Sequence, residues 1–181
     1  MKKLLFVQAA LLILFVSSCG KGRQASVENI KDLELRLENE KNPLKKGPLV
    51  YGLEVLCNDF AQRFPDDSLA PEFLYKAFDE NLKLGWSERA VKSADLLIST
   101  YPKYEKTPEA LFQKAFIYDD KLNDDVKAGD TYREFLKKYP DHALSADAEN
   151  SIRFLGKTTE ETLKILEEMN KQVDSVTVRN P

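Results

Sequence analysis

The sequence contains few side chains that could carry out catalysis. His142 is the only histidine, and it follows Pro140 and Asp141 in what reads as a turn. A histidine there could act as a general base, but we interpret it as a solvated turn residue. The chain has no Gly-x-Ser-x-Gly, no phosphate-binding loop and no His-Glu-x-x-His, and its seven glycines do not cluster. We therefore expect no catalytic residue and no enzymatic activity.

One acidic run, residues 119–125, could be considered as a calcium loop. It lacks the spaced Asp-x-Asp-x-Asp-Gly order and the distal glutamate that such loops use. We interpret it as a hydrated turn that caps the following helix. The sequence therefore predicts neither a metal site nor a cofactor.

The first 18 residues have the pattern of a targeting segment. Lys2 and Lys3 precede an apolar run, residues 4–16, that is interrupted only by Gln8. As a helix this run would be roughly 20 Å long, which is short of the roughly 30 Å hydrocarbon core of a bilayer. A signal peptide, residues 1–18, fits better than a membrane span.

The segment that follows the apolar run, Val-Ser-Ser-Cys-Gly at residues 16–20, resembles the lipobox of bacterial lipoproteins. The resemblance implies that Cys19 is lipidated and becomes the mature N-terminus, with residues 19–26 as a polar tether. It implies an envelope protein anchored by lipid. Gly20 in place of aspartate favours the outer membrane, facing the periplasm. The alternative is an ordinary secretory signal with an incidental cysteine.

The second cysteine, Cys57, is left without a partner once Cys19 carries lipid, so no intramolecular disulfide can form. It lies in a helical run, residues 53–60, and we expect a buried, inert thiol. The alternative is a reactive or intermolecular thiol.

The charge of the chain argues against nucleic-acid binding. Removal of Lys2 and Lys3 with the signal peptide leaves 25 basic and 30 acidic side chains. The basic residues are scattered, whereas nucleic-acid binding needs a clustered positive surface.

An aromatic-proline landmark recurs three times, in residues 63–66, 100–103 and 138–141, with 37 and then 38 residues between the prolines. Proline lacks an amide hydrogen and disfavours helix in the preceding residue, so each landmark should end a helix. Pro71 and Pro108 each lie six residues further on, where a new helix can begin with proline in its first turn.

Between the landmarks the apolar residues recur with helical spacing, and no stretch alternates as a half-buried strand does. The sequence therefore predicts an all-α domain, residues 27–172, followed by a flexible tail, residues 173–181. We expect helices near 27–40, 48–64, 70–84, 87–101, 108–121, 125–139, 143–155 and 159–171, the first and last acting as terminal caps.

The spacing of small residues resembles that of tetratricopeptide repeats. Ala90 precedes Pro102 by twelve residues, and Ala128 precedes Pro140 by the same interval. The resemblance implies a short α-solenoid of antiparallel helix pairs with three to four repeats. Units of 37–38 residues exceed the family's usual length of about 34. In this they are similar to the repeats of outer-membrane assembly lipoproteins and periplasmic repeat coordinators.

In tetratricopeptide proteins the residues that face the binding groove come mainly from the first helix of each repeat. By that resemblance the candidate partner-binding residues are Tyr75, Lys76, Asp79, Phe112, Gln113 and Phe116. The three aromatic residues among them could equally belong to the core. Trp86, at a turn, is either a core residue that locks two helices or a recognition anchor.

These patterns predict a membrane-anchored scaffold that binds an envelope protein or peptide segment through a helical surface. One alternative is an accessory subunit of the outer-membrane β-barrel assembly machinery. A more distant alternative is an envelope enzyme or metal-binding protein. The sequence leaves the partner and the oligomeric state open.

Overall fold

The computed structural model describes residues 2–177, with side chains described from residue 21 to residue 171. The described chain contains helices and turns and no strand, which confirms the predicted all-α class of tetratricopeptide-like helix pairs. It divides into two compact units, Met1–Ala110 and Leu111–Pro181. Within the described residues, none of the helices is both long enough and apolar enough to cross a membrane.

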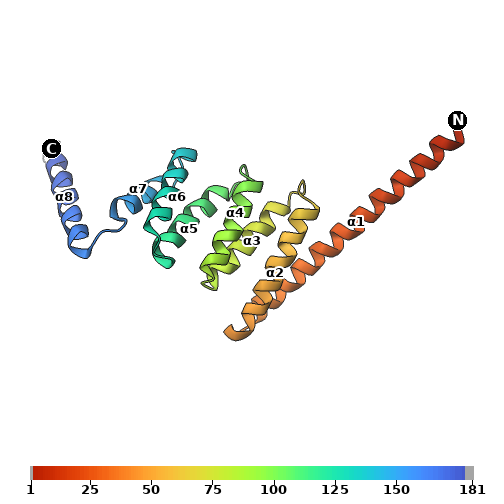
Figure 1. The fold of residues 1–181 in the computed structure, drawn as a ribbon, viewed down its shortest axis with the longest axis horizontal. Helices are drawn as coiled ribbons and strands as arrows, with labels where there is room; N and C mark the ends of the chain where they lie inside the picture. The colour runs from red at the N-terminus through yellow and green to blue at the C-terminus, as the bar shows by residue number, and fades with distance from the viewer. Residues whose placement is uncertain (1, 178–181) are drawn as a thin grey trace. The chain divides into compact units, whose positions relative to one another are not determined.

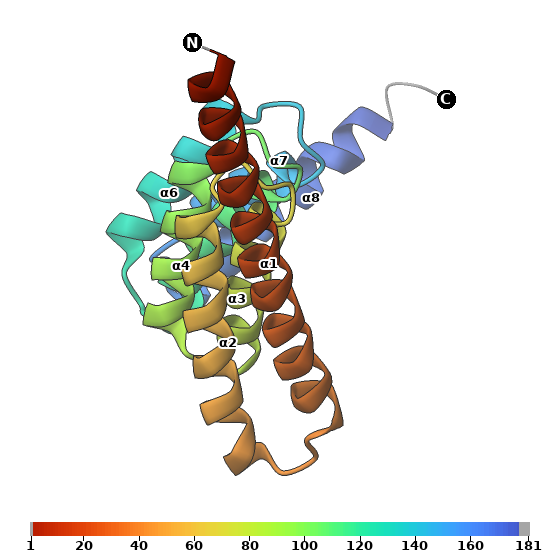
Figure 2. The same cartoon turned by 90° about the vertical axis from the view of Figure 1, so that its right-hand side faces the viewer.

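The first unit contains α1 (Lys2–Asn39), α2 (Pro43–Arg63), α3 (Ala70–Lys83) and α4 (Ser87–Thr100), each packed against the next (Figure 1). In Figure 2, α1 and α2 run antiparallel and are joined by a turn at the end opposite the N-terminus. Buried apolar residues from all four helices form the core, among them Ile30, Leu53, Cys57, Phe60, Leu74, Phe78, Ala94 and Leu97. As predicted, Cys57 is fully buried, and burial raises the pKa of its thiol to about 12.

The helix α5 (Thr107–Phe116) spans the division between the units and continues into a π-helical turn, η1 (Ile117–Lys121). The second unit then contains α6 (Asp125–Lys138), α7 (Ser145–Phe154) and α8 (Thr159–Thr177), with α6 packed against η1 and α7. Its core consists of Leu111, Ala115, Ile117, Ala128, Tyr132, Phe135 and Ala148.

The helix α8 begins with the reciprocal capping pair that the sequence predicts. The Thr158 hydroxyl accepts a hydrogen bond from the Glu161 amide at 3.2 Å, and the Glu161 carboxylate accepts one from the Thr158 amide at 2.9 Å. Leu163 and Leu166 are 56% and 42% exposed, however. The apolar face of this predicted C-terminal cap is therefore largely uncovered.

The three aromatic-proline landmarks form three copies of one turn. The residue before each proline, Phe64, Tyr101 or Tyr139, has φ between −127° and −135° and ψ near 60°. In each copy its amide donates to the carbonyl oxygen four residues earlier at 2.8 Å. In two copies a hydroxyl six residues later, from Thr107 or Ser145, donates back to its carbonyl oxygen. The sequence repeat is therefore also a structural repeat.

The lengths of the repeats differ by one residue for a local reason. The start of α4 lies 17 residues after the start of α3, whereas the start of α6 lies 18 residues after the start of α5. In both repeats the second helix, α4 or α6, starts 20 residues before the next helix starts. The extra residue is therefore contained in the first helix and its turn, where η1 closes with a bond from the Leu122 amide to the Ile117 carbonyl.

Three predicted boundaries need correction. The helix α1 is continuous through residues 19–26, so the segment predicted as a polar tether is helical. The helix α2 begins at Pro43 and not near residue 48, because the Asn42 side chain accepts a hydrogen bond from the Leu44 amide and caps the helix there. The helix α8 continues to Thr177, within the predicted tail 173–181, and residues 178–181 lie outside the described residues.

Candidate functional site

The α3 part of the predicted partner-binding surface is held by fixed contacts in the first unit. The ring of Tyr75 lies 5.8 Å from that of Phe78 and 6.5 Å from that of Tyr104, and the Lys106 Nζ lies 4.8 Å from its centroid. Burial is the main cause of the raised pKa of the Tyr75 hydroxyl, and a hydrogen bond to the Glu109 carboxylate raises it further. The half-buried Tyr75 ring is therefore presented in one orientation.

The two charged candidates on α3 make ion pairs within the chain. The Lys76 Nζ lies 3.4 Å from a carboxylate oxygen of Glu34 on α1, and Asp79 pairs with Lys83 at 2.6 Å. Lys76 and Asp79 are half-buried. A partner that used either charge would have to share or replace these intramolecular contacts.

The α5 candidates in the second unit divide into core and surface. The ring of Phe112 packs edge-on against Tyr132 and Phe135, with both centroid distances 5.6 Å, so Phe112 mainly serves the core. Gln113 is half-buried, while Phe116 is 42% exposed. Phe116 is therefore the aromatic candidate on α5 that a partner could reach.

A hollow of about 550 Å³ lies in the first unit beside Trp86, and sequence reasoning missed most of its lining. Its walls include Gly47, Tyr51, Trp86 and Arg89, from α2, the α3–α4 turn and α4. The Arg89 guanidinium lies 4.8 Å from the Tyr51 ring centroid and 5.5 Å from that of Trp86. A side chain at position 47 would bring a Cβ within 3.2 Å of the indole, so glycine permits this close approach.

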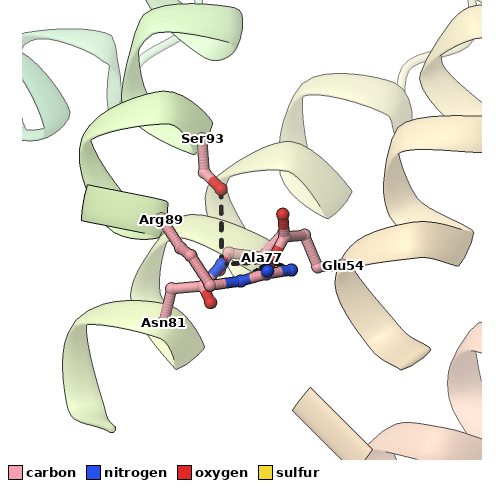
Figure 3. A network of polar contacts seen from close by, with 5 residues as sticks. All are labelled: Glu54, Ala77, Asn81, Arg89 and Ser93. Atoms are coloured by element: carbon pink, nitrogen blue, oxygen red, sulfur yellow. Dashed lines mark hydrogen bonds and ion pairs between the residues drawn. The ribbon is translucent and has the colours of Figure 1, made fainter. Parts of the chain in front are cut away.

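The charged wall of the hollow is fixed by a polar network that joins three helices (Figure 3). Arg89 donates two hydrogen bonds to one Glu54 oxygen, at 3.1 Å and 2.8 Å. The same oxygen accepts a hydrogen bond from the side-chain amide of the fully buried Asn81 at 2.9 Å. The Asn81 nitrogen also contacts the Ala77 carbonyl and the Ser93 hydroxyl. Trp86 was the only member of this region with a signal in the sequence, since the others become neighbours only on folding.

The histidine and the acidic run that the sequence offers for catalysis or metal binding instead make contacts that stabilise turns and helix ends. His142 accepts a hydrogen bond from the Leu144 amide at 3.2 Å, and its half-buried ring packs on Phe135. In the acidic run, Asp124 caps α6 by accepting from the Lys127 amide, while burial and the nearby Asp125 and Asp120 raise the pKa of Asp119. No cluster of three potential metal ligands occurs among the described residues.

Comparison with known families agrees with this geometry. The sequence model of the tetratricopeptide repeat family matches residues 109–142, which comprise most of α5, η1, α6 and the turn that follows. No curated protein is significantly similar to the chain. The chain therefore contains a tetratricopeptide repeat, a fold element that generally binds proteins.

Proposed function

We propose that this chain is a protein-binding scaffold of the bacterial cell envelope, anchored to the membrane through lipid on Cys19. The observation that carries the proposal is the tetratricopeptide repeat at residues 109–142, together with the same turn geometry after α2. Within that repeat the exposed ring of Phe116 stands on the first helix. Aromatic anchors of this kind contribute much of the free energy of binding at protein interfaces.

Site-specific photocrosslinking in cells tests the binding surface. A photoreactive phenylalanine analogue at position 116 should form one discrete protein adduct. The same analogue at position 126 provides the control, because Val126 lies on the second helix of the same repeat and is 73% exposed. Equal labelling at both positions, or none, would contradict a binding surface on the first helix.

The identity of the crosslinked protein distinguishes an accessory subunit of the β-barrel assembly machinery from a scaffold for another envelope protein. Recovery of the barrel-assembly channel protein would support an accessory subunit of that machinery. A different envelope protein would retain the scaffold function with another partner. Oligomerisation of the chain itself would appear as an adduct with a second copy.

Metabolic labelling with a fatty-acid analogue tests the anchor separately. The native chain should incorporate the label and fractionate with membranes, and Cys19→Ser should abolish both. Cys57→Ser is the matched control, since that thiol is buried and should not be modified. Failure of the native chain to incorporate label would exclude the lipid anchor without affecting the binding surface.

A further inference from the structure

The N-terminal helix α1 is fastened to the first unit from Arg23 onward. The Arg23 guanidinium forms an ion pair and two hydrogen bonds with Asp67, in the turn between α2 and α3, and one bond measures 3.2 Å. The Ser26 hydroxyl accepts a hydrogen bond from Arg63 at 3.3 Å. Val27 and Ile30 are buried at 5% and 0% exposure. From Arg23 onward, α1 is therefore part of the packed body.

The distance between the proposed lipid and this body is short. Cys19 and Arg23 belong to one uninterrupted helix, α1. Four residues of helix advance by about 6 Å, roughly one turn. A flexible tether would let the domain reorient, whereas one helical turn is a short, semi-rigid spacer. The position of Cys19 therefore determines which end of the first unit lies nearest to the bilayer.

That end contains two neighbouring turns, residues 64–69 and residues 101–106. They are joined by a hydrogen bond from the Tyr101 hydroxyl to the Pro65 carbonyl at 2.9 Å. In Figure 2 the turn from α1 to α2 lies at the opposite end of the first unit. Trp86 follows α3, a helix of 14 residues that begins at Ala70, so it lies roughly 20 Å from this end.

We propose that a lipid bilayer lies against the end of the first unit formed by residues 64–69 and 101–106. We name it the membrane-facing end. The inference rests on the proposed lipidation of Cys19 and goes beyond it by fixing an orientation. The domain would stand on this end, with the hollow beside Trp86 turned away from the bilayer.

The charges at the membrane-facing end are too nearly balanced to hold it against the bilayer. Lys103 and Lys106 are exposed, and so are the acidic Asp66 and Glu105, while Asp67 is paired with Arg23. The surface is thus close to neutral, and attraction to anionic headgroups would be weak and screened by salt. The rigid attachment of α1, and not surface charge, sets the orientation.

The test uses single-tryptophan reporters and vesicles. A chain of residues 19–181 is coupled through Cys19 to a maleimide lipid, in phosphatidylcholine vesicles that contain a headgroup spin label. Cys57 is fully buried and does not compete for the maleimide. One reporter is the native Trp86. The other is Lys103→Trp combined with Trp86→Phe, which places the reporter at an exposed position of the membrane-facing end.

We expect spin-label quenching at position 103 to be at least about threefold greater than at position 86, and unchanged in 0.5 M salt. Insertion of eight Gly and Ser residues after Gly20 should remove the difference, since it restores a flexible tether. Circular dichroism shows whether each variant is folded. A second reporter at the same end, Asp66→Trp with Trp86→Phe, should repeat the result of the first.

Equal quenching at positions 86 and 103 in the coupled native-length chain would overturn the inference. This outcome is independent of the proposed function, because the lipid is attached chemically. Absence of fatty-acid labelling in cells would instead remove the biological anchor and leave the measured orientation of the coupled chain intact.

Discussion

The network between Glu54, Asn81 and Arg89 makes a quantitative prediction about stability. Glu54 is 14% exposed and accepts from both other side chains, so Glu54→Ala removes an ion pair and leaves the buried Asn81 amide with fewer acceptors. Hydrogen bonds to charged groups contribute about 1.5–3 kcal/mol each. Because the Arg89 side chain is 38% exposed, we discount its pair with Glu54 to about 1 kcal/mol.

The loss of the Asn81 hydrogen bond adds about 1.5 kcal/mol, at the low end of this range because the Asn81 nitrogen keeps two other acceptors, which gives about 2.5 kcal/mol in total for Glu54→Ala. With a urea slope of about 2 kcal/mol/M, the unfolding midpoint should fall by about 1 M. Trp86 fluorescence is the appropriate probe, since the indole lies against Arg89 and reports the first unit. Glu54→Gln retains an acceptor for Asn81, and it should lose only about half as much.

A double-mutant cycle with Glu54→Ala and Arg89→Ala isolates the ion pair. The matched control is Asp32 with Arg36 on α1, a pair at 3.6 Å whose side chains are 65% and 59% exposed. We expect a coupling of about 1 kcal/mol for Glu54 with Arg89 and less than about 0.5 kcal/mol for the control. If the two couplings were equal, the partial burial of the network would contribute nothing to stability, and the reasoning would fail.

Three further outcomes are expected. In a chain without the N-terminal cysteine, native Cys57 should react with a maleimide at pH 8 about 1000-fold more slowly than the urea-unfolded chain, because burial raises the pKa of its thiol from 9.0 to about 12 and lowers its thiolate fraction by about that factor. Equal rates would show that the site opens freely. Gly85→Ala should cost about 1–2 kcal/mol for its φ of +70°. Gly156→Ala, at φ of +66°, should cost about as much by thermal melting, since the Asp125 carboxylate that its Cβ would meet belongs to an exposed side chain that can move aside. The guanidinium of Arg23 holds the pKa of Asp67 below its ordinary 3.8, so this pair stabilises the fold above that pH and its contribution is lost as the pH falls through the lowered pKa. Asp67→Asn should therefore be less stable than the native chain in urea at pH 7, and the difference should shrink as the pH falls below 3.8.

The helices were predictable because their ends depend on nearby residues. Pro65, Pro102 and Pro140 act through the backbone of adjacent residues, so the ends of α2, α4 and α6 fall within one or two residues of the predictions. The start of α2 was predicted near residue 48, but the Asn42 cap begins the helix five residues earlier, at Pro43.

The binding surface was less predictable, because long-range contacts decide which face of a helix remains open. Phe112 and Phe116 are one helical turn apart and look alike in sequence, but only Phe112 is covered by Tyr132 and Phe135. The helical state of residues 19–26 was likewise not evident from composition. These residues are polar and contain glycine, which favours flexibility locally, whereas Asp67, distant in sequence, pairs with Arg23 in α1.

The π-helical turn at Ile117–Lys121 has a consequence for how such a chain can change over generations. An α-helix that gains one residue would rotate everything beyond the insertion by about 100° and carry its apolar face away from the core. A π turn takes up the additional residue in a single widened loop. Here Ala115 remains buried before the turn, Ile117 within it, and Ala128 and Tyr132 after it. The turn thus marks a place where a repeat can lengthen or shorten by one amino acid while its neighbours keep their packing.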